Sequence, residues 1–146
     1  MRSKDRVEVE LESNLKSVDT AEEVARDFAK SAGFEEEDEE KIALAVREAM
    51  VNAVYHGNQY DRNKRAGLRL EVENHNLVIT ITDQGPGFEL TSIPDPLAEE
   101  NLLKQTGRGI FLIRSFMDEI HVRRLSPQGT EVRMIKYAAP KNGKED

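Results

Sequence analysis

The segment from Lys41 to Tyr55 constrains the fold most, because the helix that it predicts is apolar on nearly every side. Its apolar residues are Ile42, Ala43, Leu44, Ala45, Val46, Ala49, Met50, Val51, Ala53, Val54 and Tyr55. A helix with so little polar surface is buried on most sides. The consecutive acidic residues from Glu35 to Glu40 favour a helix start just before it. Gly57 is expected to end the helix in a left-handed cap.

The remaining elements are predicted to come in blocks rather than in regular alternation of strand and helix. Alternating apolar and acidic residues over 7–12 predict an opening strand, followed by a helix that Asp19 or Thr20 caps and that ends near Gly33. The elements that follow are two strands, a helix and two strands, at 68–73, 77–83, 110–117, 120–125 and 130–137. Adjacent strands favour an α+β class, a two-layer α/β sandwich with a mixed, mostly antiparallel sheet and helices on one face.

Composition narrows the classes of function. A chain of 146 residues predicts one domain over 1–140 with a frayed tail over 141–146. The absence of cysteine excludes disulfides and thiolate chemistry, and the net charge of −7 argues against nucleic-acid binding. No apolar run approaches the roughly 18 residues of a membrane span, and the N-terminus is polar. We therefore expect no membrane association and a cytoplasmic location.

The buried helix carries a carboxylate and an amide on one face. Glu48 and Asn52 lie four residues apart, so they project from the same side of the helix. The amide oxygen of Asn52 suits Mg²⁺, which also takes oxygens from nucleotide phosphates. Glu48 can then accept a proton from an attacking hydroxyl group or water. The alternative is a pair that only bonds to neighbouring loops.

A second cluster follows the strand that ends at Asp83. A carboxylate at this position can accept a hydrogen bond from the exocyclic amine of adenine, whereas guanine presents an acceptor there. Gly85 and Gly87 allow the backbone to turn and to approach a ligand closely. A turn with no ligand is the simpler alternative.

The third cluster begins the helix that opens at Ile110. Free amide groups of Gly107, Arg108 and Gly109 at a helix start form an anion site, to which Lys104 adds positive charge. The alternative is an ordinary capped helix start. The loop before it, 84–106, has little periodicity and is expected to act as a lid.

In this order the three clusters resemble the N box and the two glycine boxes of one superfamily of ATPases and kinases. It is the Bergerat-fold superfamily of gyrase-type ATPases, Hsp90-type chaperones and histidine kinases. The likeness runs from about Lys41 to Met134. Within it, Asn52-Ala53-x-x-His56-Gly57 and Phe116-Met117-Asp118 look like the bacterial anti-sigma-factor serine/threonine kinases.

The resemblance implies roles for these residues. Glu48 would be the general base, Asn52 would hold Mg²⁺, and Asp83 would bind adenine with help from Thr130, which follows Gly129 as in the family's late Gly-Thr pair. The phosphates would meet the second glycine box, which is preceded by Lys104 and formed by Gly107, Arg108, Gly109 and Ile110.

The function implied is an ATP- and Mg²⁺-dependent anti-sigma factor and serine/threonine protein kinase of a partner-switching pathway. Its partners would be a sigma factor and an anti-anti-sigma antagonist, and it would form a homodimer. Two other interpretations stay open. One is a non-catalytic module that binds a protein when ATP is present. The other is a detached histidine-kinase ATPase domain.

Overall fold

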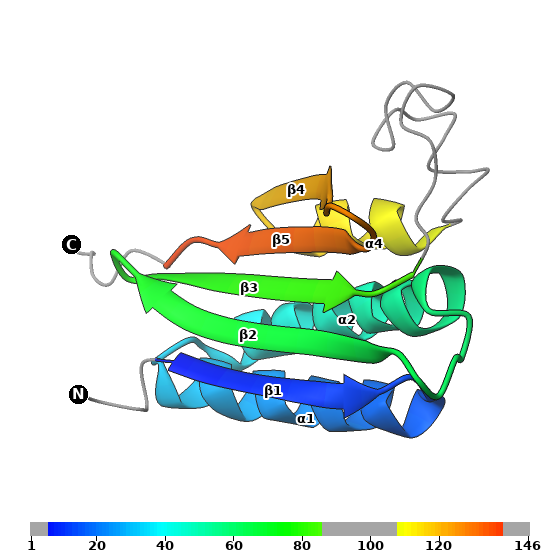
Figure 1. The fold of residues 1–146 in the computed structure, drawn as a ribbon. Coiled ribbons are helices and arrows are strands. Elements are labelled where there is room, and N and C mark those ends of the chain that lie inside the picture. The colour runs from blue at the N-terminus through cyan, green and yellow to red at the C-terminus, as the bar shows by residue number, and fades with distance from the viewer. Residues whose placement is uncertain (1–5, 86–107, 139–146) are drawn as a thin grey trace.

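The computed structural model describes residues 6–85 and 108–138, except the side chains of residues 108–111. The chain forms one strand, then a run of helices, two strands, one helix and two final strands (Figure 1). In chain order they are β1 (Arg6–Glu12), α1 (Leu15–Ser31), α2 (Glu36–Val51), the π-helical turn η2 (Asn52–Gly57), β2 (Arg65–Glu73), β3 (Asn76–Asp83), α4 (Arg108–Phe116), β4 (Glu119–Arg124) and β5 (Thr130–Lys136). In this described part of the chain, no helix is long and apolar enough to cross a membrane.

The sheet has five strands in the order β1-β2-β3-β5-β4. Each neighbouring pair of described strands is antiparallel. Helices α1, α2 and α4 lie behind one face of the sheet, and no described helix covers the other face (Figure 1). The predicted α+β class with helices on one face is therefore confirmed.

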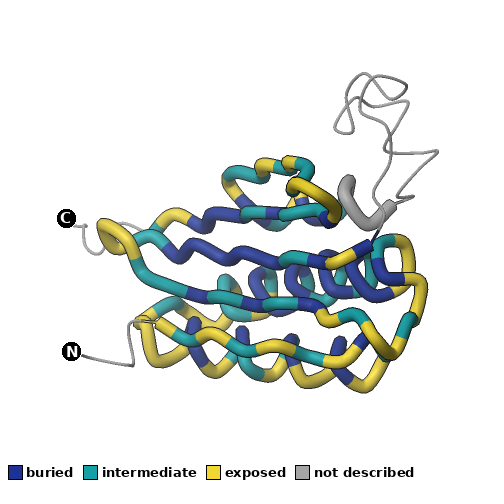
Figure 2. Tube along the Cα trace, in the orientation of Figure 1, coloured by how far each residue is buried: buried dark blue, intermediate teal, exposed yellow. Residues whose placement is uncertain are grey.

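The core lies between the sheet and the helices, because alternate residues of each strand point toward α1 and α2. The buried residues of the sheet include Leu68, Leu70, Ile79, Ile81 and Met134, and those of the helices include Ala25, Phe28, Ile42, Val46 and Met50. Figure 2 shows β3 and the inner side of α2 as the most continuous buried stretches. Helix α2, the central helix, contacts both α1 and α4, and its apolar residues are largely buried as predicted, whereas Tyr55 in the turn that follows is 50% exposed.

Two predictions about helix ends were wrong. Helix α1 begins at Leu15, because the side chain of Asn14 caps it by accepting a hydrogen bond from Ser17 N at 2.9 Å. Thr20 lies inside the helix, where its hydroxyl group donates to Lys16 O. Gly57 is not left-handed, whereas Gly33 is, with φ of 94°. The predicted lid over 84–106, beyond Gly85, and the predicted tail lie outside the described residues.

Candidate nucleotide site

The two polar residues of the central helix lie where its hydrogen-bond pattern changes. Glu48 is in the last turn of α2, and Asn52 opens η2, in which Asn58 N donates to Ala53 O at 2.8 Å, five residues back. Single π-helical turns within helices are frequent at functional sites. In the described ranges, the Glu48 carboxylate has no hydrogen-bond or ion-pair partner, and the buried amide nitrogen of Asn52 has none either. Both groups therefore keep unused bonding capacity.

Asp83 ends β3 and is only 8% exposed. Its carboxylate accepts hydrogen bonds from the backbone amides of Gly85, at 3.0 Å, and Thr130. Burial raises the pKa of Asp83, while those two hydrogen bonds and the charge of Lys64 oppose the rise. The Asp83 carboxylate is therefore a hydrogen-bond acceptor in an environment where burial disfavours its charged form.

Three glycines surround Asp83 so closely that no side chain fits. A Cβ atom on Gly57 would overlap the Asp83 carboxylate, and one on Gly85 would overlap the carbonyl of Gly57. A Cβ atom on Gly129, whose φ is +109°, would lie 2.5 Å from Asp83 O. The end of η2 thus packs directly against Asp83. This contact joins the helix that carries Glu48 and Asn52 to the end of β3.

The residues present fit an adenine nucleotide with a hard divalent cation. Asp83 offers a buried acceptor, the glycines keep the backbone close to it, and Asn52 offers a neutral amide beside a carboxylate. Buried polar groups without partners are rare in folded proteins, and each one calls for an explanation such as a ligand. The buried amide nitrogen of Asn52 is such a group among the described residues; as a donor it would be satisfied by a phosphate oxygen or a water, whereas a cation would bind the amide oxygen.

The other predicted site residues fall into two sets. Thr130 opens β5 and pairs in register with Asp83. Arg108 begins α4, and Gly109 and Ile110 follow in its first turn, as predicted for a helix start at this point. The residues Gly87, Lys104 and Gly107 lie outside the described part of the chain.

The sequence prediction missed the residues that hold these segments together. Asn58, only 1% exposed, joins the end of η2 to Ser13, to Arg65 and to Gln84, which follows Asp83. The only local signal was its place directly after Gly57. The contact with Ser13 spans 45 residues, and no short motif encodes such a distance.

Comparison with known proteins agrees with this geometry. The family described as histidine kinase-like ATPase domain matches residues 11–136. The chain therefore belongs to the histidine kinase-like ATPase domain family. The resemblance drawn from the three clusters is confirmed.

Individual relatives are serine-protein kinases and an anti-sigma factor. The chain is 36% identical over 115 residues to the serine-protein kinase RsbW of Staphylococcus epidermidis, covering 73% of this chain and 70% of that relative. It is 31% identical over 99 residues to the anti-sigma F factor of Anoxybacillus flavithermus, covering 66% and 68%. RsbW of Bacillus subtilis is 30% identical over 115 residues, with 75% and 71% covered.

A solved structure has the same fold. It contains the RsbU and RsbW domains of a Mycobacterium tuberculosis protein and matches with a TM-score of 0.67 at 15% identity. The match covers 91% of this chain and 32% of that longer chain. At this identity, the likeness supports the fold alone.

Proposed function

We propose that this chain is an anti-sigma factor and serine/threonine protein kinase that uses ATP and Mg²⁺. One observation carries the proposal: at Gly57, the end of the helix that carries Glu48 and Asn52 packs against the buried Asp83 carboxylate. This contact joins Glu48, the proposed general base, and Asn52, the proposed Mg²⁺ ligand, to Asp83, which would bind adenine. The serine-protein kinases and the anti-sigma F factor among its relatives support the same activity.

Each residue has a distinct task in this proposal. Asp83 accepts a hydrogen bond from the adenine amine, Asn52 provides an oxygen for Mg²⁺, and Glu48 takes the proton of the attacking serine hydroxyl group. When bound, Mg²⁺ neutralises charge on the phosphate oxygens. The start of α4, with Arg108 and Gly109, and the residues Gly87, Lys104 and Gly107 before it complete the phosphate side, and Thr130 supports Asp83.

The partners we propose are a sigma factor, which the protein holds inactive, and an antagonist protein that it phosphorylates on serine or threonine. Both would be cytoplasmic, as would this chain. The anti-sigma F factor among the relatives is the support for this pairing. The single domain over 1–140 would then contain both the nucleotide site and the partner surface.

Phosphoryl transfer to an antagonist tests the proposal. Wild-type protein, labelled ATP and a candidate antagonist from the same genome should yield label on serine or threonine. Glu48→Gln should lower the transfer rate by roughly 10²–10⁴, the usual contribution of a positioned base, with nucleotide affinity changed only a few fold. Asn52→Ala should instead abolish Mg²⁺-dependent binding, because it removes the metal ligand.

The possible results separate the alternatives. Tight ATP binding without transfer to any such antagonist would favour a nucleotide-gated binding module. Undiminished transfer by Glu48→Gln would keep the kinase and remove Glu48 as its base. Transfer to a histidine would instead indicate a detached histidine-kinase ATPase domain.

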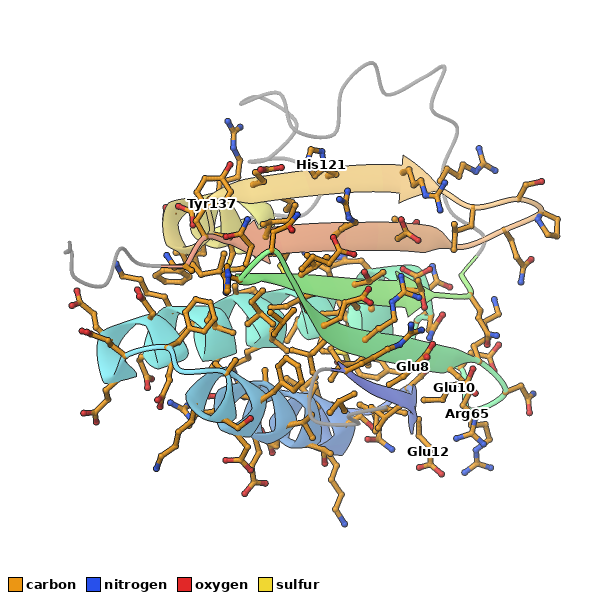
Figure 3. All side chains as sticks on the ribbon, turned by 90° about the vertical axis from the view of Figure 1, so that its left-hand side faces the viewer. Glu8, Glu10, Glu12, Arg65, His121 and Tyr137 are labelled. Carbon is orange, nitrogen blue, oxygen red and sulfur yellow. The ribbon has the colours of Figure 1, made fainter. Side chains whose placement is uncertain are left out.

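We also propose a homodimer that forms through the helix-free face of the sheet. On that face Val78 and Thr80 are each 4% exposed, and Arg69 and Arg133 flank Thr80 on the two neighbouring strands. Within the described residues, the hydroxyl group of Thr80 is buried without a hydrogen-bond partner. Charged residues also line the edge strand β1, where Figure 3 shows Glu8, Glu10 and Glu12 pointing away from the helices.

Sedimentation of the wild type should give twice the chain mass. A monomeric wild type would rule out the dimer.

A further inference from the structure

Asn58 is the most buried polar side chain among the described residues, with 1% of its surface exposed. Its amide nitrogen donates to Ser13 Oγ at 2.8 Å and to Arg65 O at 3.0 Å, and its amide oxygen accepts from Gln84 N at 2.8 Å. The backbone partners fix the orientation of the amide, because Arg65 O can only accept and Gln84 N can only donate. Both donors of the amide are therefore in use.

These bonds join segments that are far apart in the sequence. Ser13 lies between β1 and α1, Arg65 opens β2, and Gln84 directly follows Asp83. Two further hydrogen bonds hold the same segments together. Ser13 Oγ donates to Lys64 O at 2.6 Å, and Arg65 N donates to Gln84 Oε1 at 2.6 Å. In Figure 1 the ends of β1 and β3 and the start of β2 lie at the same end of the sheet as the end of the central helix.

The backbone after Asn58 is strained. Gln59 and Tyr60 follow with φ of 54° and 58°, in the left-handed region that residues other than glycine rarely adopt. Such residues persist where the surroundings hold them in place, and this happens often at functional sites. Tyr60 N donates to Val54 O at 3.0 Å, so the turn folds back onto η2.

Asn58 also lies between the two parts of the nucleotide site. Gly57, directly before it, meets the Asp83 carboxylate, and Gln84, which it holds, is bonded covalently to Asp83. A shift of the Asn58 amide would therefore move both Gly57, which contacts the Asp83 carboxylate, and Gln84, which is bonded to Asp83.

We propose that Asn58 is a positioning residue that fixes Asp83 for recognition of the purine 6-position. This inference rests on the proposed nucleotide function and assigns base selectivity to a residue that touches no ligand. A structural role alone would lower stability without changing which base is preferred. The preference between bases is therefore the deciding measurement.

Calorimetric titration with Mg·ATP and Mg·ITP tests the proposal, because inosine carries a carbonyl group in place of the adenine amine. Wild-type protein should prefer ATP. Asn58→Ala should lower the ratio of ATP to ITP affinity by about tenfold or more, since a misplaced acceptor loses its bond to the amine. Ser13→Ala, which removes only one of the three partners of the amide, should lower the ratio by a smaller factor.

Asn76→Ala is the matched control. The side chain of Asn76 accepts from Ala138 N at 3.0 Å at the start of β3, the opposite end from Asp83. This variant should keep the wild-type ratio even where its unfolding midpoint falls. An Asn58→Ala protein that folds and keeps the ratio would overturn the inference.

Two further results are decisive. If Asn58→Ala does not fold, Ser13→Ala decides, and an unchanged ratio there overturns the inference. A wild type that prefers ATP while both variants keep that preference leaves the nucleotide function intact and removes only Asn58. A wild type that binds neither nucleotide, or both equally, removes the adenine site itself and Asn58 with it.

Discussion

The two ends of the sheet each hold a carboxylate that accepts two hydrogen bonds, and the pKa values of the two carboxylates shift in opposite directions. At the end of β3, Asp83 accepts from the amides of Gly85 and Thr130, and burial raises its pKa. At the start of β4, Glu119 accepts from Tyr137 Oη at 2.5 Å and contacts His121 Nε2 at 2.9 Å. These contacts, the one from Tyr137 above all, lower the pKa of Glu119.

The difference lies in solvation rather than in the number of bonds. Figure 3 shows Tyr137 and His121 at the surface, at the end of the sheet that faces the viewer. Water screens the charges there, and exposed ion pairs contribute little to stability. Asp83 has lost its water, and two amide bonds do not compensate fully. The charged form of the carboxylate is thus disfavoured at the end of the sheet that holds Asp83 and favoured at the end that holds Glu119.

The largest effect on stability is expected from Gly85→Ala. Its new Cβ atom would overlap the carbonyl of Gly57, a backbone group that cannot rotate away. We expect a loss of about 2–3 kcal/mol in the free energy of unfolding, as for other overpacked sites, together with loss of ATP binding. Urea unfolding and calorimetry measure the two effects.

Gly67→Ala is the control for that change. Its Cβ atom would lie 2.6 Å from Thr82 Oγ1, a side-chain atom on the helix-free face that can move by rotation. We expect a change of less than about 1 kcal/mol and normal ATP binding. Equal losses in the two variants would contradict a specific role for the glycines around Asp83.

Candidate site residues could be proposed from the sequence, whereas the contacts that join their segments could not. Glu48, Asn52 and Asp83 could be named because each belongs to a short motif whose chemistry depends on local spacing. The π-helical turn was missed because its extra residue per turn does not disturb the apolar pattern of so hydrophobic a helix. The hydrogen bonds of Asn58 were missed because their partners come from other strands.

Gly57 illustrates why one residue type can mislead. Glycine after a helix usually indicates a left-handed cap, and Gly33, near which the first helix was predicted to end, has a positive φ of 94°. At Gly57 the requirement is space, because the Asp83 carboxylate occupies the place of its side chain. Local sequence does not distinguish a conformational need from a contact made across the fold.

The next effect in size is expected for Asp83→Asn. The new amide would place a donor against the adenine amine, where the carboxylate offers an acceptor. We expect ATP affinity to fall by about 1–3 kcal/mol, the cost of an unsatisfied buried group. Calorimetry with ATP and GTP measures it, and an unaffected variant would remove Asp83 from the site.

A smaller effect is expected in the pH dependence of the protein without nucleotide. Because burial raises the pKa of Asp83, the folded protein holds this proton more tightly than the unfolded chain does. The stability due to this group is complete below the unfolded pKa, and it falls as pH rises through the higher folded value. Relative to wild type, Asp83→Asn should therefore gain stability as pH rises above about 4. Urea unfolding across that range would show parallel curves if the pKa of Asp83 were not raised.

The smallest effect is expected at the other end of the sheet, for Tyr137→Phe. The change removes the hydrogen bond that does most to lower the pKa of Glu119, so that pKa should rise toward its ordinary value. NMR titration of the Glu119 carboxylate would record the rise. The urea midpoint and ATP affinity should both stay at their wild-type values, because these groups are exposed and lie far from Asp83 along the sheet. A marked loss of stability in Tyr137→Phe would show that solvation does not separate the two ends, and that the exposed bonds contribute as much as the buried ones.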